Sequence, residues 1–146
     1  MTREPISIRA IASLSPLGTD PDTVWEAYQE PAHALSRMEG IPGNPYAGRL
    51  SGREEAQLTE IRASRPAYAK LDRSVLCALG AGRLAVAQAG WSRGCGFGIN
   101  MGSSRGATGL FEQYHRDFSG TGAVATQASP TTTLGNIASW MAQDLG

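Results

Sequence analysis

The chain has 146 residues, a length that fits one domain, and its 13 basic and 13 acidic residues cancel to a formal net charge of zero. The longest charged run is Arg53-Glu54-Glu55, so no basic patch predicts nucleic-acid binding. Arg73, Arg83 and Gln88 interrupt the most apolar stretch, so we expect no membrane-spanning segment.

The first fifty residues predict a strand, a short helix and a loop. Ile6, Ile8 and Ala10 alternate with polar residues, which is typical of a strand buried on one face. The first ten residues contain charged residues and a proline, and they lack the continuous apolar core of a secretory signal. After the turn "SPLG", Thr19 or Asp20 can cap a helix in which Pro21 suits the first turn. Segment 30–52 is rich in turn residues and predicts a surface loop, with a brief edge strand at 47–51.

Two helices are predicted next. Ser51 and Glu54 form a capping-box pattern that begins a polar helix, which should end before Pro66. Segment 68–91 is the strongest helical pattern in the chain, with leucine and valine side chains along one broad face. Gly80 and Gly82 lie inside it, and small residues there favour close packing against another element. We therefore expect a buried central helix.

The last third predicts one more strand and two helices. Segment 97–104, "FGINMGSS", reads as a strand that enters a glycine-rich turn, followed by a helix over 107–118 and a flexible link at 119–123. A final helix carries Ile137, Trp140, Met141 and Leu145 on one face. This order of elements indicates an α/β protein, although two strands are too few for a complete sheet.

Two segments could bind a ligand. The turn 100–106, "NMGSSRG", precedes a helix, so its N–H groups could hold an anion near Arg105, but it matches no phosphate-binding motif and a tight structural turn is the favoured interpretation. Thr131, Thr132 and Thr133 place three hydroxyls at a helix entrance. Helix capping is the favoured role for them, and the wall of a small polar pocket is the alternative.

The cysteines and histidines give no clear catalytic pattern. Cys77 lies among apolar residues and Cys95 lies in a glycine loop, with no CxxC spacing and no histidine cluster beside them. We therefore predict no metal site, no disulfide scaffold and a reducing, cytoplasmic setting. His33 and His115 are assigned structural roles, and a Cys–His pair formed in space stays open as an alternative.

Four segments together resemble the N-terminal half of β-ketoacyl-[acyl-carrier-protein] synthases. They are "IRAIASLSPLGTDPDTVWEAYQE", "LDRSVLCALGAGRLAVAQAGW", "GINMGSSRGATGLFEQY" and "ASPTTTLGNIASWMAQDLG", in the order that the family has them. The match is weakest over 31–69. The resemblance implies that 1–146 is the incomplete N-terminal half of a thiolase-like fold, a mixed sheet with helices on its faces, in an enzyme that is usually dimeric.

The resemblance also implies a chemistry and its partner. Family members receive an acyl group from the phosphopantetheine thiol of an acyl carrier protein, hold it on a cysteine, and join it to a decarboxylated malonyl group. No other cofactor is implied. A thiolate at a helix N-terminus carries the acyl group, and histidines stabilise the enolate and oxyanion. Arg105, Thr131, Thr132, Thr133 and Leu134 match positions that line the family's acyl pocket.

The catalytic positions of the family have no match in this chain. In the family, the nucleophilic cysteine follows the segment that resembles 131–146, and none of Cys77, Cys95, His33 and His115 matches a catalytic residue. The leading hypothesis is therefore an N-terminal ketosynthase fragment that is inactive alone. The alternatives are a non-catalytic interaction module that pairs with a separate chain, and a small enzyme that uses Cys95.

Overall fold

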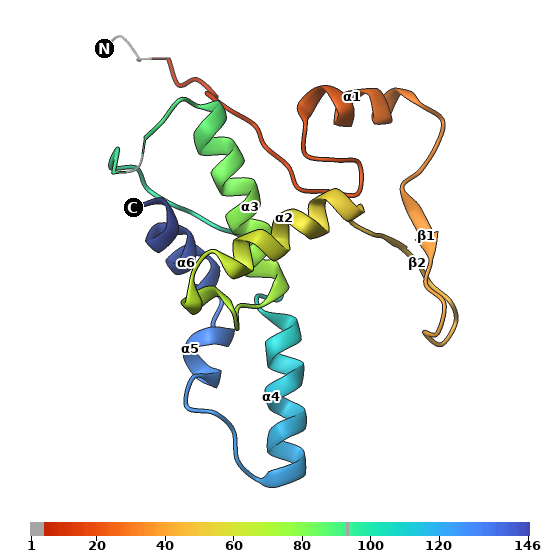
Figure 1. The fold of residues 1–146 in the computed structure, drawn as a ribbon, viewed down its shortest axis with the longest axis vertical. Coiled ribbons are helices and arrows are strands. Elements are labelled where there is room, and N and C mark those ends of the chain that lie inside the picture. The colour runs from red at the N-terminus through yellow and green to blue at the C-terminus, as the bar shows by residue number, and fades with distance from the viewer. Residues whose placement is uncertain (1–4, 93) are drawn as a thin grey trace. The chain divides into compact units, whose positions relative to one another are not determined.

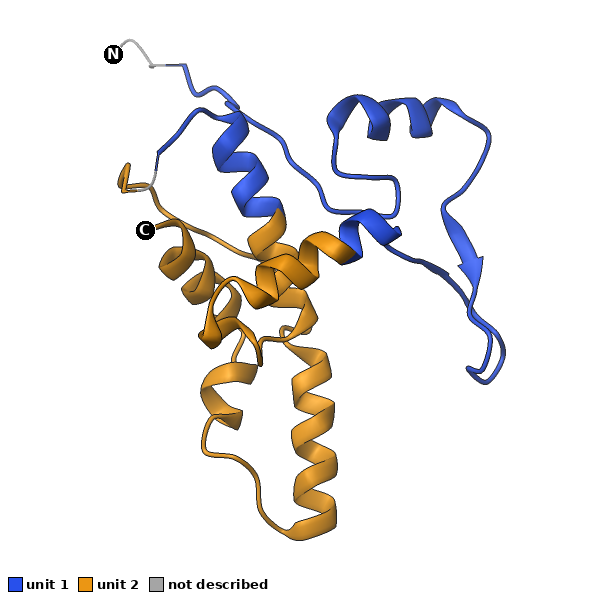
Figure 2. Ribbon diagram, in the orientation of Figure 1, with its two compact units in different colours: residues 1–55, 81–92 blue, residues 56–80, 93–146 orange. Residues whose placement is uncertain are grey.

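The computed structural model describes residues 5–92 and 94–146, and it divides into two compact units. Unit 1 comprises 1–55 and 81–92, and unit 2 comprises 56–80 and 93–146 (Figure 2). The helices along the chain are α1 Pro21–Gln29, α2 Gly52–Ala63, the 3₁₀ turn Pro66–Tyr68, α3 Arg73–Gln88, α4 Thr108–Thr121, α5 Ala128–Thr132 and α6 Asn136–Leu145 (Figure 1). The strands described are β1 Leu35–Arg37 and β2 Tyr46–Gly48.

Unit 1 contains α1 and a short hairpin. The predicted cap of α1 is confirmed, because the Thr23 N–H donates to Asp20 Oδ2 at 3.0 Å. Strands β1 and β2 pair antiparallel, with Leu35 opposite Gly48 and Arg37 opposite Tyr46. The predicted edge strand at 47–51 therefore exists at 46–48, while the prediction of a loop missed its partner β1.

The polar helix α2 begins at its predicted cap. The Ser51 N–H donates to Glu54 Oε2 at 2.9 Å, and the Arg53 N–H donates to Ser51 Oγ at 3.2 Å. The hydrogen bond from Ser51 lowers the pKa of the Glu54 carboxyl below its usual range. The capping-box prediction is confirmed, and the helix ends at Ala63, before Pro66 as expected.

Unit 2 holds the hydrophobic core of the described residues. Its fully buried side chains are Tyr68, Val75, Leu76 and Leu79, each less than 2% exposed. The core is completed by the buried side chains of Leu58, Ile61, Leu71, Ala107, Ile137, Met141 and Leu145. The prediction of a buried central helix is confirmed for the first half of α3, whereas its second half, from Ala81, is at most half-buried.

The two strands predicted at 6–11 and 97–104 are wrong: both segments are irregular chain. A strand is stable only when a neighbouring strand accepts its hydrogen bonds, and among the described residues neither segment has such a neighbour. Ile6, Ile8 and Ile11 are consequently 101%, 81% and 73% exposed. The described chain is therefore mostly helical with a two-stranded antiparallel sheet.

The helix predicted over 107–118 is longer than expected. It runs through Thr121, because Thr121 Oγ1 donates to Asp117 O at 2.8 Å and the Gly122 N–H donates to Phe118 O at 2.8 Å. The predicted link therefore starts after Thr121 rather than at residue 119. In the part of the chain that the structure describes, no helix combines the length and the apolar character that crossing a membrane requires.

Candidate functional site

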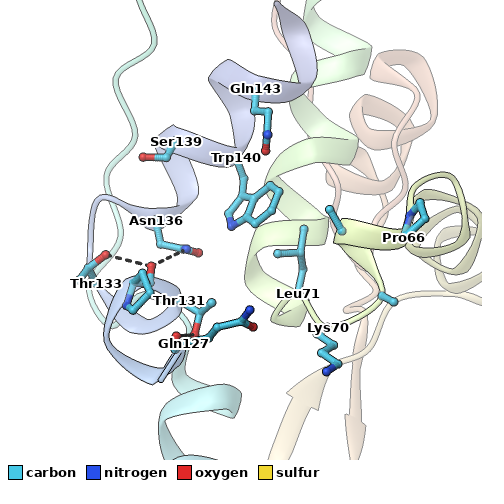
Figure 3. Close-up of a pocket in the computed structure, with 13 residues that line it drawn as sticks. Pro66, Lys70, Leu71, Gln127, Thr131, Thr133, Asn136, Ser139, Trp140 and Gln143 are labelled. Carbon is cyan, nitrogen blue, oxygen red and sulfur yellow. Dashed lines mark hydrogen bonds between the residues drawn. The ribbon is translucent and has the colours of Figure 1, made fainter. Parts of the chain in front are cut away.

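A pocket of about 800 Å³ opens in unit 2 (Figure 3). One wall is the segment that joins α2 to α3, which contributes Pro66, Lys70 and Leu71. A second wall comes from α5 and its flanks, and a third comes from α6, which contributes Ser139, Trp140 and Gln143. The volume lies within the range of ordinary ligand sites.

Hydrogen bonds within the second wall fix its shape. Asn136 Nδ2 donates to Pro130 O at 3.0 Å, and Thr133 Oγ1 donates to the same carbonyl at 3.4 Å (Figure 3). Thr131 Oγ1 donates to Gln127 O at 2.6 Å. These hydroxyl protons point to the backbone, so the oxygens of Thr131 and Thr133 offer the pocket acceptor lone pairs rather than donors.

Three further polar side chains of the pocket offer donors. Gln127 and Gln143 contribute side-chain amides and Lys70 contributes an ammonium group, and none of these three makes a hydrogen bond or ion pair with another described residue. The pocket is lined by no carboxylate among the described residues. Its single charge is therefore positive, which favours a neutral or anionic ligand over a cation.

Trp140 is held in the pocket wall by a buried polar cluster. The Tyr68 hydroxyl donates to Asp144 Oδ1 at 2.8 Å, and Tyr68 presents its ring edge-to-face to Trp140 at 5.8 Å. The guanidinium of Arg65 lies 5.3 Å from the Tyr68 ring centroid and 3.8 Å from Asp144. The burial of Tyr68 and Asp144 makes this hydrogen bond costly to remove.

The structure brings the glycine-rich turn and the threonine segment together. A Cβ on Gly106, whose φ is +63°, would lie 3.5 Å from Leu134 Cδ2 and 3.8 Å from Thr132 O. Arg105 precedes this contact and is exposed. Of the five predicted substrate-pocket residues, Thr131 and Thr133 line the large pocket, whereas Arg105, Thr132 and Leu134 lie outside its lining.

The anion site considered at the start of α4 is occupied by the protein's own Asp72. Oδ1 of Asp72 accepts from Ser74 N at 2.8 Å and from Ser74 Oγ at 2.6 Å, and Oδ2 accepts from Leu110 N at 3.0 Å. One carboxylate thus caps α3 and also α4, where the residue at the N-cap position, Ala107, has no side-chain acceptor. A Cβ on Gly109 would lie 2.9 Å from Oδ2, so a larger residue at this position would require the carboxylate to shift.

Hydrogen bonding favours the charged form of Asp72. Burial raises the pKa of its carboxyl, but the hydrogen bonds from the Ser74 side chain and from the backbone of Ser74, Leu110 and Gly109 outweigh burial, so the net pKa lies below its ordinary value. The turn itself is closed internally, since the Gly106 N–H donates to Ser103 Oγ at 2.9 Å. These contacts favour the structural interpretation of segment 100–106.

The cysteines and histidines lie in dissimilar surroundings. Cys77 is half-buried on α3, and Cys95 is exposed at the start of the irregular segment 95–103. His115 is exposed on α4 beside Phe111. His33 belongs to unit 1, where its Nδ1 accepts from Leu35 N at 3.3 Å. No group of three or more potential metal ligands occurs within residues 5–92 and 94–146.

Of the residues that line the pocket, the sequence assigned only Thr131 and Thr133 to a ligand site. Sequence reasoning gave no role to Lys70, Gln127 or Gln143, and it assigned Trp140 only to the apolar face of a helix. A weak signal existed for Trp140, because an indole carries a polar N–H that a core does not satisfy by itself. For the others no signal existed, since the pocket forms from segments that are about sixty residues apart in the sequence.

No family model and no curated protein matches this chain. Among solved structures, it is similar to a β-ketoacyl synthase from Burkholderia phymatum STM815, with a TM-score of 0.68 and 19% sequence identity. The likeness covers 94% of this chain and 36% of that protein, so the chain spans about a third of the length of the synthase. At this identity the comparison shows the fold, which is ketosynthase-like.

Proposed function

We propose that residues 1–146 are the N-terminal part of a β-ketoacyl-[acyl-carrier-protein] synthase, which condenses acyl and malonyl thioesters with loss of CO₂ in fatty-acid or polyketide synthesis. The observation that carries the proposal is the structural likeness, which extends over 94% of the chain at a TM-score of 0.68. The four sequence segments that resemble the family, in the family's order, support it independently.

The contact between Gly106 and Leu134 supports a common role for the two segments that carry it. Arg105 precedes this contact, and the segment from Thr131 to Leu134 contains its other side. We infer that these five residues shape the acyl pocket of the complete enzyme. The exposed guanidinium of Arg105 favours an acyl group with a polar or charged substituent over a long simple chain.

The reaction needs groups that the described site does not provide. Covalent condensation requires a cysteine thiolate with histidines placed to stabilise the enolate and the oxyanion. Cys77 is half-buried on α3, and Cys95 and His115 are exposed on separate segments. We therefore expect these 146 residues to be inactive without the remainder of the fold, and the acyl carrier protein to dock on the complete enzyme.

The experiment compares this chain with the product of its native gene. The reading frame is followed past the codon for Gly146, the intact mass is measured from the source, and both proteins are assayed with acyl- and malonyl-carrier protein for CO₂ release and product. We expect a longer product that condenses and a 146-residue chain that does not. Condensation by the 146-residue chain itself, abolished by Cys95→Ser, would overturn the proposal and favour the small-enzyme alternative.

A stop codon directly after Gly146, with a matching mass, would instead favour the interaction module. The exposure of Ile6, Ile8 and Ile11, of which the first two alternate with polar residues along a segment that pairs with no described strand, is the observation that suits such a module. Alternating apolar residues of this kind can add a strand to a sheet of another chain. Co-purification of a second ketosynthase chain with the 146-residue protein would then identify the partner that completes the fold.

A further inference from the structure

Helix α1 of unit 1 presents two aromatic side chains to solvent. Trp25 is 66% exposed and Tyr28 is 72% exposed, and α1 has no buried residue. The two rings are three residues apart, so they are neighbours on the surface of the helix. Neither side chain makes a hydrogen bond or a ring contact with another described residue. The pair is therefore open to contact by a partner.

A row of carboxylates runs beside these rings. Asp22, Glu26 and Glu30 are all exposed and follow one another at steps of four residues, which places them along one side of the helix. Asp22 is also three residues before Trp25, so the row adjoins the rings. Segment 21–30 contains no basic residue, and the three side chains make no ion pair or hydrogen bond with another described residue. The face thus carries a negative charge that no described side chain pairs with.

The position of these charges is unfavourable for the helix itself. Helix α1 ends at Gln29, its last turn has no basic residue, and Glu30 is its C-cap. The C-terminus of a helix carries a partial negative charge, so the carboxylates of Glu26 and Glu30 are repelled there. A cation that binds from outside would remove this repulsion. The charge pattern therefore favours a cationic partner.

We propose that the outer face of α1 binds a partner protein through a basic peptide segment that contains arginine. A guanidinium can stack on the ring of Trp25 or Tyr28 and also pair with a carboxylate of the adjacent row. Lysine supplies the charge without the planar stacking. The uncompensated carboxylates disfavour an acidic or purely apolar segment. A helix of nine residues is about 14 Å long, so a short segment covers it, and we expect weak, salt-sensitive binding.

Titration calorimetry of the 146-residue chain with an alternating arginine–glycine octapeptide tests the proposal, and it needs no condensation activity. We expect saturable binding that weakens at least tenfold between about 50 mM and about 500 mM salt. The corresponding lysine peptide should bind at least threefold more weakly, because it loses the stacking. Absence of binding, or equal binding of the corresponding glutamate or leucine peptide, would overturn the proposal.

Substitutions locate the binding on α1. Trp25→Ala and Glu26→Lys should each weaken binding of the arginine peptide at least fivefold, and circular dichroism checks that these exposed positions leave the helices intact. Tyr46→Ala and Glu39→Lys are the matched controls, because both residues are exposed in the hairpin segment of unit 1, outside α1. They should leave the binding unchanged. Equal losses in the two sets would show unspecific attraction of the peptide and refute the α1 site.

A native gene product longer than 146 residues provides a last comparison. We expect it to bind the arginine peptide as tightly as the 146-residue chain does. Loss of binding in the longer product would show that the remainder of the chain covers α1, and the proposal would then be wrong.

Discussion

A single substitution at Asp72 should weaken two helices at once. Asp72→Ala removes the acceptor for Ser74 at the start of α3 and the acceptor for Leu110 at the start of α4. Loss of one N-cap costs about 1 kcal/mol, so two caps cost about 2 kcal/mol, and loss of the negative charge near two helix N-termini adds up to about 1 kcal/mol for each. We expect the free energy of unfolding to fall by about 2–4 kcal/mol, a large share of the roughly 5–15 kcal/mol that is usual for a domain.

Urea unfolding followed by far-ultraviolet circular dichroism measures this loss. Asp117→Ala is the control, because Asp117 is an exposed aspartate of α4 whose side chain makes no hydrogen bond with another described residue. It should change the free energy of unfolding by less than about 0.5 kcal/mol. If Asp72→Ala costs no more than Asp117→Ala, the shared cap contributes nothing and the reasoning is wrong.

The same carboxylate predicts a dependence on pH. The pKa of Asp72 is lower in the folded chain than its ordinary value of 3.8, so its contribution is fully present above about pH 4 and is lost as the pH falls through the folded pKa. Asp72→Asn keeps one acceptor oxygen and cannot titrate. We therefore expect it to lose about half as much stability as Asp72→Ala at pH 7, and the difference from the wild-type chain to shrink below pH 4. A difference that stays constant down to about pH 2 would contradict the assigned pKa.

Two further substitutions test the contacts of unit 2. Gly109→Ala should lower the free energy of unfolding by about 1 kcal/mol despite alanine's higher helix propensity, because its Cβ would lie 2.9 Å from Asp72 Oδ2; Gly120→Ala on the same helix meets open space and should raise it by about 0.5 kcal/mol. Chemical denaturation measures the free energy of unfolding of both variants. A change of the same sign in both would refute the close approach at Gly109. Tyr68→Phe should cost about 2 kcal/mol in the same assay, because it removes the hydrogen bond to the buried carboxylate of Asp144. A cost below about 0.5 kcal/mol would show that this hydrogen bond does not hold the cluster together.

The helices could be predicted from the sequence because their signals are local. Asp20 before Pro21 and the pair Ser51 and Glu54 are capping patterns within four residues, and each begins a helix as predicted. The strand at 6–11 could not be judged in the same way. Its isoleucines indicate a local preference for extended backbone. A strand also needs a neighbouring strand to pair with, and the described chain provides none for this segment.

The candidate site was predictable only in part, for the same physical reason. The threonine segment was recognised because three hydroxyls stand together in the sequence, whereas Lys70 and Trp140 reach the pocket from elements far apart in the chain. The cap of α3 by Asp72 has a local signal, because Ser74 follows two residues later. Its second role, at Leu110, depends on a contact across 38 residues, which no local pattern reports.

The tryptophans give the two units separate optical reporters. Trp25 is 66% exposed and Trp91 is 44% exposed, and both belong to unit 1, while Trp140 is half-buried in unit 2 with the ring of Tyr68 5.8 Å away. Excitation of Tyr68 can transfer energy to Trp140 at this distance, and an aqueous quencher such as iodide reaches the exposed indoles of unit 1 first. The tryptophan emission that iodide does not quench therefore comes from Trp140 in unit 2. The decrease of this emission during denaturation reports when the pocket wall unfolds, and no added label is needed.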